Sequence, residues 1–220
     1  MIRKSSYHGN PYIGLFVEVS ESFSLFPTDI NKKLRSAVIE TLNVEPIYIN
    51  IAESNLNGAY AVALKDIVLL PSICSEEEVG LLKEKGIDVF LVDTRFNALK
   101  NNIVIGKKGG LINPRMEKEV KKSIEDALGI ELAAKRIADY STVGSIIYTT
   151  SKGFLMTYKA SDEEFRFVED ILGLEGERTS LNMGTHFISL SILANSRGAV
   201  VGELTTGIEL ARVEQGLGLV

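Results

Sequence analysis

The fold of this chain is decided by the stretch 97–141, NALKNNIVIGKKGGLINPRMEKEVKKSIEDALGIELAAKRIADYS. It predicts a β-hairpin (IVI, the turn GKKGG, then LI), a helix, and a strand that begins after LGI. Asn113 suits the N-cap of that helix, and Pro114 suits its first position, where the missing N–H costs nothing. Apolar residues then recur every four positions until Gly129, which tolerates a left-handed helix end. This spacing is typical of a helix with one buried side.

The landmarks of this unit recur along the chain. The helix-ending position returns at intervals of 43 or 44 residues, at Asn43, Gly86, Gly129, Gly173 and Gly216. The start of each hairpin returns at similar intervals, at Gly14, Gly58, Asn101 and Gly144. A fixed period in this range indicates repeats that share burial with their neighbours. Five such copies nearly exhaust the 220 residues.

The two ends of the chain distinguish a closed array from an open one. The fifth copy stops where the other copies begin their last strand, and residues 1–9 precede the first hairpin. An open solenoid would need polar capping repeats, which we do not find in the sequence. We therefore expect residues 1–220 to form a single α+β domain, a five-bladed α/β propeller. Its five ββαβ-like repeats would be closed into a ring by the N-terminal strand.

Several helix starts can be predicted from capping residues. Ser75 with Glu78, and Ser161 with Glu164, have the spacing of capping boxes. Asp29 suits the cap of a first helix that spans residues 29–42, and the last helix is expected over residues 206–215.

Composition narrows the possible functions. The net charge of −5 argues against a protein that holds nucleic acid mainly through phosphates. Apolar runs are too short for a membrane span, and the N-terminus lacks the apolar core of a signal peptide. Cys74 is the single cysteine, so neither an intramolecular disulfide nor a zinc-type Cys/His cluster is expected. These features predict a cytoplasmic protein without a membrane anchor.

Few residues could support catalysis. Cys74 lies near a predicted helix N-terminus, which could activate a thiol, but the neighbouring acidic run 76–78 opposes thiolate formation. His8 and His186 could each act as a general base, although both residues fit ordinary packed or surface positions better. The glycine pairs complete no phosphate-binding motif. We predict no catalytic, cofactor-binding or metal-binding residues.

The segments that precede the hairpins are expected to cluster at one end of the ring. They read NPYI, SNLN, NALKNN, DYSTVG and NMGTH, and they are rich in Asn and small residues. Each segment alone has the composition of an ordinary loop. Together they predict a broad, shallow, mildly polar platform, which fits a protein or an RNA-protein surface better than a small ligand.

Several motifs make the sequence similar to a known family. They are NPYIGLF, NALKNN, LGIE, TVGS, LNMGT and LANSRGAVVGELTTGIELARVEQGLG. The chain resembles archaeal translation initiation factor six, a ribosome anti-association factor. The resemblance implies the pentein fold and a non-enzymatic factor that binds the large ribosomal subunit. The main partner would be an L14-family ribosomal protein near the sarcin-ricin loop, with limited ribosomal RNA contact.

The resemblance also implies a mechanism and a set of contact residues. A monomer without a cofactor would sterically prevent the small subunit from joining, with a possible further role in large-subunit biogenesis. The family motif Ala-Leu-Gly-Asn is matched by residues 98–101, where Lys100 replaces the glycine. By this motif and by pseudosymmetry, the predicted ribosome-binding residues are Asn10, Tyr12, Asn57, Ala59, Lys100, Asn101 and Asn102.

An enzymatic alternative uses the same fold. Pentein hydrolases and transferases that modify amidine groups place a nucleophilic cysteine near the end of the chain. No cysteine follows Cys74 here, which disfavours that alternative. The C-terminal regulatory tail of eukaryotic members is also missing, so we do not expect regulation through its phosphorylation.

Overall fold

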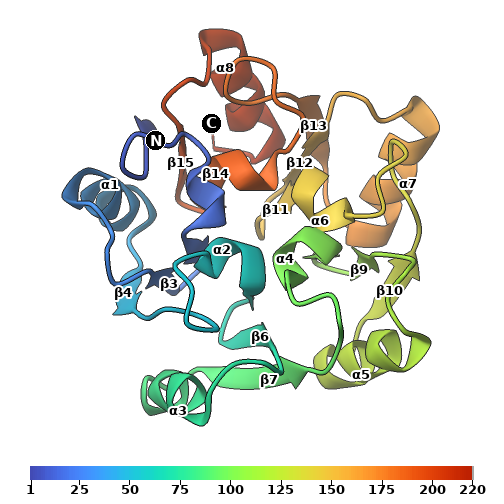
Figure 1. Cartoon of the computed structure of the whole chain (residues 1–220). Helices are drawn as coiled ribbons and strands as arrows, with labels where there is room; N and C mark the ends of the chain where they lie inside the picture. Colours follow the sequence, from blue (N-terminus) through green and yellow to red (C-terminus); the bar gives the residue numbers. More distant parts are fainter. Residues whose placement is uncertain (220) are drawn as a thin grey trace.

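The protein forms a ring of five blades around a central axis (Figure 1). The computed structural model describes residues 1–219, and Val220, the last residue of the predicted domain, lies outside the described residues. Each blade is a three-stranded sheet whose first two strands form an antiparallel hairpin. The third strand pairs in parallel with the second. This arrangement confirms the five-bladed α/β propeller of ββαβ units, the pentein architecture.

The strands occupy equivalent places in the blades. The first strands are β2 (Glu18–Val19), β5 (Val62–Ala63), β8 (Ile103–Ile105), β11 (Ile147–Thr149) and β14 (Ile192–Asn195). The second strands are β3 (Phe23–Phe26), β6 (Ile67–Pro71), β9 (Gly109–Ile112), β12 (Phe154–Thr157) and β15 (Gly198–Gly202). The third strands are β4 (Glu45–Tyr48), β7 (Asp88–Val92), β10 (Glu131–Ala134), β13 (Gly176–Thr179) and, for the fifth blade, β1 (Ile2–Ser5).

The N-terminal strand closes the ring. Strand β1 pairs in parallel with β15, with Ile2 opposite Ala199 and Ser5 opposite Gly202. It therefore supplies the third strand of a blade whose other two strands come from the end of the chain. The prediction of closure by the N-terminal segment is confirmed.

The long helices lie on the outside of the ring (Figure 1). They are α1 (Lys32–Leu42), α3 (Glu76–Glu84), α5 (Lys118–Leu128), α7 (Asp162–Leu172) and α8 (Gly207–Gly216). Both predicted capping boxes are present, and Thr206 with Glu209 forms a third. Asn43, Gly129 and Gly173 end their helices in the left-handed conformation.

Three helix ends differ from expectation. Helix α5 begins at Lys118, because Asn113 is used elsewhere: its side chain accepts a hydrogen bond from Arg115 N and donates one to Asn102 Oδ1. Asp29 does not cap α1, since its carboxylate accepts a hydrogen bond from the Tyr7 hydroxyl. The N-cap position is held by Asn31.

Helix α8 differs at its C-terminal end. It spans residues 207–216, one position later than expected, and includes Gly216. The residue with positive φ is Gly218, at 57°.

The hydrophobic core is divided among the interfaces between blades. Phe26 and Leu34 of the first blade pack with Leu193 of the fifth, and each of the other four clusters also joins two neighbouring blades. A single blade therefore cannot bury its apolar surface alone, as expected for repeats that share burial.

Five short helical turns surround the axis, at positions where the sequence pattern predicted the start of hairpins. They are η1 (Ile13–Leu15), α2 (Asn57–Tyr60), α4 (Leu99–Asn102), α6 (Val143–Ile146) and η2 (Ser189–Ser191). Each turn contacts the next one around the ring. Figure 1 shows α2, α4 and α6 facing the centre.

Glycine allows neighbouring turns to approach through their backbones. A Cβ atom on Gly14 would lie 2.0 Å from Ser189 O, and one on Gly58 would lie 2.0 Å from Gly14 O. A Cβ atom on Gly144 would likewise lie 2.0 Å from Lys100 O. These contacts make Lys100 the equivalent of the glycines. The predicted alignment of Asn101 with them was therefore wrong by one residue.

We expect Gly58→Ala to destabilise the protein by more than about 2 kcal/mol, because its methyl group would overlap the backbone of the neighbouring turn. Urea unfolding checks this value. The matched control is Gly80→Ala in α3, where nothing lies within 4 Å of an added Cβ. That variant should gain roughly 0.5–1 kcal/mol from helix propensity. Equal effects of the two substitutions would contradict the close approach.

Candidate functional site

Five junctions connect the third strand of one blade to the short helical turn of the next. The third strands are pseudosymmetric, so their carboxyl ends lie at one face of the ring. We call this surface the junction face. Its turns are residues 7–10, 51–54, 93–96, 137–140 and 181–185. All except 93–96 are closed by an antiparallel bridge, such as Tyr7 with Asn10.

The bridged turns contain consecutive residues with positive φ. Examples are Ala52 and Glu53, at 52° and 56°, and Ala138 and Asp139, at 47° and 65°. Residues with a Cβ atom adopt this region at an energetic cost. The surrounding structure must therefore hold the turns in place.

Capping residues of the outer helices hold these turns. One carboxylate oxygen of Glu78 completes the capping box of α3, and the other accepts a hydrogen bond from Glu53 N at 3.0 Å. Glu164 does the same for α7 and Ala138 N, at 2.7 Å. In the first blade, Asn31 Oδ1 accepts a longer hydrogen bond from His8 N, at 3.4 Å. The sequence pattern predicted the capping boxes of α3 and α7 but not the hydrogen bonds of their glutamates to the junction turns.

Glu209 is the most buried of the capping residues that bind junction turns. It caps α8 through Thr206 N and also accepts hydrogen bonds from Ser180 Oγ and Gly184 N. Burial alone would raise the pKa of Glu209, but these hydrogen bonds outweigh it and hold the pKa below its usual value. The side chain therefore stays ionised and fixes the junction turn of the fifth blade to its helix.

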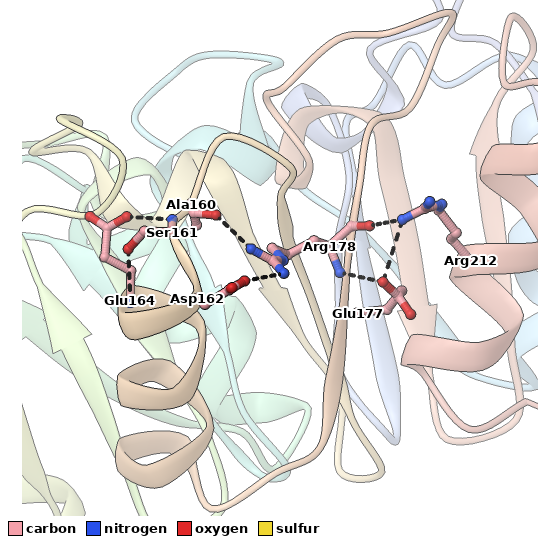
Figure 2. A network of polar contacts seen from close by, with 7 residues as sticks. All are labelled: Ala160, Ser161, Asp162, Glu164, Glu177, Arg178 and Arg212. Atoms are coloured by element: carbon pink, nitrogen blue, oxygen red, sulfur yellow. Dashed lines mark hydrogen bonds and ion pairs between the residues drawn. The ribbon is translucent and has the colours of Figure 1, made fainter.

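Arginines add a further link between the fourth and fifth blades (Figure 2). Arg178 on β13 donates to Ala160 O at 2.9 Å and to Asp162 Oδ1 at 2.6 Å, beside the capping box of α7. Arg212 on α8 donates to Arg178 O at 2.7 Å. Both arginines are partly exposed, so we expect the network to orient these elements more than to stabilise them.

Three of the predicted contact residues lie beneath the surface of the junction face. They are Asn57, Ala59 and Asn102, all buried. Asn57 accepts a hydrogen bond from Ile51 N and donates one to Ile49 O, and Asn102 donates to Ala98 O. The side-chain amides of Asn57 and Asn102 are therefore used inside the junctions, and direct contact of these three residues with the ribosome stays a prediction.

The other predicted residues divide into two groups. Asn10, Tyr12 and Asn101 are half-buried and reach the surface. Asn101 Oδ1 has no hydrogen-bond partner within residues 1–219. Lys100 turns away from the face into the ring, where its Nζ lies 2.7 Å from Glu18 Oε1. A surface contact through the Lys100 ammonium is therefore not supported.

The ring encloses a central channel. Hairpin residues from all five blades line a cavity of about 390 Å³, among them Glu21, Lys65, Lys107, Thr150 and Asn195. A smaller cavity of about 40 Å³ shares several of its lining residues and includes Lys100 and Tyr148. The Lys100 side chain therefore lines the central cavity.

The candidate catalytic groups do not form a site. Burial first, and then Glu78, raise the pKa of the Cys74 thiol to about 11. His186 Nε2 pairs with the Tyr140 hydroxyl at 2.8 Å, and partial burial and Lys159 lower its pKa. His8 Nε2 contacts Asp29 O at 2.8 Å.

Residues 1–219 contain no group of three or more His, Cys, Asp or Glu side chains that could hold a metal ion. Within the same residues, no helix has both the length and the apolar character needed to cross a membrane.

Comparisons with known proteins give a consistent family. The profile of the eIF-6 family matches residues 2–216. Translation initiation factor 6 of Methanocaldococcus jannaschii is 38% identical over 228 residues, covering 100% of this chain and 99% of the relative. The factor of the same name from Pyrobaculum arsenaticum is 33% identical, covering 96% of each chain. Among solved structures, DDAH from Pseudomonas aeruginosa has a TM-score of 0.46 and 12% identity, over 94% of this chain and 73% of that one.

We expect Cys74 to be unreactive. With a thiol pKa of about 11, the thiolate fraction at pH 8 is about 100-fold below that of an ordinary cysteine. The rate of alkylation by iodoacetamide, compared with that of glutathione, measures this difference. The urea-unfolded chain is the control and should react at the ordinary rate. If the folded protein reacts as fast as glutathione, Cys74 remains a candidate nucleophile.

We expect Glu209→Gln to destabilise the protein at pH 7 by about 1–3 kcal/mol, because the amide cannot accept the same set of hydrogen bonds. The folded pKa of Glu209 is lowered, so its stabilisation is present above the unfolded pKa of about 4.3 and is lost as the pH falls through the folded value. Thermal unfolding from pH 7 to pH 3 should show the difference from wild type shrinking. Glu214→Gln, at an exposed position of α8, should show no such trend.

Proposed function

Because this chain belongs to the eIF-6 family, we propose that it binds the large ribosomal subunit and sterically prevents the small subunit from joining. The observation that carries the proposal is the match to translation initiation factors over nearly the whole chain. A steric blocker needs a stable shape and a binding face. It does not need catalytic groups.

The junction face is the proposed binding surface. Its turns are clamped by helix-capping side chains, so little conformational entropy would be lost when a partner binds. The cavity of about 390 Å³ is lined by hairpin residues and not by the junction turns. These properties fit a folded protein partner, for which we propose an L14-family ribosomal protein near the sarcin-ricin loop. The net charge of −5 favours limited contact with ribosomal RNA.

Asn10, Tyr12 and Asn101 are the proposed direct contacts. Asn101 has the strongest case, because it ends the segment 98–101 that matches the family motif and its side chain is only half-buried. Its Oδ1 is enclosed, so contact with a partner would be made through the exposed part of the side chain. Asn10 is more constrained, since its Oδ1 already accepts a hydrogen bond from Tyr12 N at 2.9 Å.

We propose a non-enzymatic role, as a cytoplasmic monomer that could also act during large-subunit biogenesis. The raised pKa of the Cys74 thiol disfavours its use as the nucleophile of the hydrolase alternative. Cys74→Ala separates the two classes, because a ribosome factor should keep its binding and an enzyme that depends on the thiol should lose activity.

We expect the wild-type protein to sediment with isolated archaeal large subunits and to inhibit their joining to small subunits. Asn101→Asp should weaken binding by about tenfold or more, because it places a negative charge where the amide meets the partner. The control Gln215→Glu adds one negative charge at an exposed position of α8 and should bind as wild type does. Absence of wild-type binding to the large subunit would overturn the proposed function. Equal binding by Asn101→Asp would remove Asn101 from the interface.

A further inference from the structure

A single polar network crosses the central channel and includes every blade. Glu18 Oε1, on β2 of the first blade, accepts hydrogen bonds from Ala63 N of the second blade at 2.9 Å and from Lys100 Nζ of the third at 2.7 Å. The same Nζ lies 5.3 Å from the centre of the Tyr148 ring of the fourth blade. The Tyr148 hydroxyl bonds to both the N and the O of Ala194 in the fifth blade.

The ion pair in this network is buried. The side chains of Lys100 and Glu18 are 17% and 3% exposed. In every other ion pair of the described residues, at least one side chain is more exposed than that of Lys100. Burial raises the pKa of Glu18, and the charge and hydrogen bond of Lys100 oppose that rise. Removing one partner would leave a buried charge without its counterion, which is far more costly than removing both.

In the other four blades the position of Lys100 is held by a small residue, Ser189 in the fifth blade and glycine elsewhere. The equivalent residues Gly14, Gly58 and Gly144 have no side chain, and their backbones approach the neighbouring turns. Lys100 instead sends its side chain into the channel from helix α4, whose next residue is Asn101. The pair with Glu18 thus restrains the turn that carries the proposed contact residue.

We propose that Glu18 and Lys100 form a cross-channel clasp, in which each buried charge neutralises the other and so keeps the α4 turn, and with it Asn101, in the orientation used to bind the large subunit. Either charge left alone would displace the turn. This role rests on the proposed function. Lys100 is then a positioning residue, and its ammonium makes no contact with the ribosome. Two consequences follow: loss of Lys100 should be reversed by neutralising Glu18, and the salt dependence of binding should not change.

The experiment compares Lys100→Met with the double variant Glu18→Gln/Lys100→Met in binding to large subunits across a range of salt concentrations. Lys100→Met should weaken binding by about tenfold or more, and the double variant should return to within about threefold of wild type. The slope of log K against log salt should stay unchanged. If Lys100 contacted ribosomal RNA phosphates, its removal would instead reduce the magnitude of this negative slope by about 0.7–0.9. The control Lys85→Met removes an exposed lysine paired with Glu45 and should change nothing.

The proposal would be overturned if Lys100→Met bound with wild-type affinity. It would also be overturned if the affinity lost in Lys100→Met were not restored by adding Glu18→Gln. If Lys100→Met fails to fold, the double variant alone decides the question. Wild-type affinity of the double variant would support the role of Lys100 as a positioning residue. Weak binding by the double variant would overturn that role. Amide hydrogen exchange of residues 98–102 tests the clasp without ribosomes. Exchange should be faster in Lys100→Met and should return to the wild-type rate in the double variant. If wild type does not bind the subunit, the proposed function fails, and this exchange result still decides whether the clasp holds the turn.

Discussion

The close backbone approach of five short helical turns around the axis is the constraint on which the rest of the structure depends. The carbonyl oxygens of Ser189, Gly14 and Lys100 lie where a Cβ atom of the next turn would otherwise be. This spacing sets the distance between blades, and the blades then bury their apolar residues against one another. Because every core cluster needs two blades, an unclosed array would leave apolar surface exposed at both ends. The pairing of β1 with β15 removes those ends.

Much of this architecture could be predicted from the sequence, because repetition makes weak local signals additive. A glycine after one amphipathic helix says little, but the same landmark at a constant interval indicates one unit used five times. The short helical turns could not be predicted, because helices such as α2 and α4 span four residues and show no helical periodicity. The start of α5 was missed for a different reason. Asn113 has the residue type of an N-cap, but its hydrogen bond to Asn102 is a tertiary contact that local pattern does not contain.

The junction face shows a similar division between local and tertiary information. The capping boxes at Ser75 and Ser161 follow from spacing alone. The second oxygen of each capping glutamate binds a junction turn that is distant in sequence, 25 or 26 residues away. Burial likewise separates the predicted contact residues: Asn57 and Asn102 are buried, and Asn101 is only half-buried. The sequence pattern does not contain this difference, because it depends on how the junctions pack in three dimensions.

At the centre of the ring, two residues from different blades depend on each other. At a position where a side chain would normally clash with the neighbouring turn, this chain carries a lysine whose long stem reaches Glu18 across the channel. A lysine there without a carboxylate partner would bury an unpaired charge, and Glu18 without the lysine would do the same with opposite sign. The two residues are therefore expected to depend on each other more than on any neighbour in sequence, although they are 82 positions apart. Because each charge needs the other, the pair links the α4 turn of the third blade to the first blade from inside the ring.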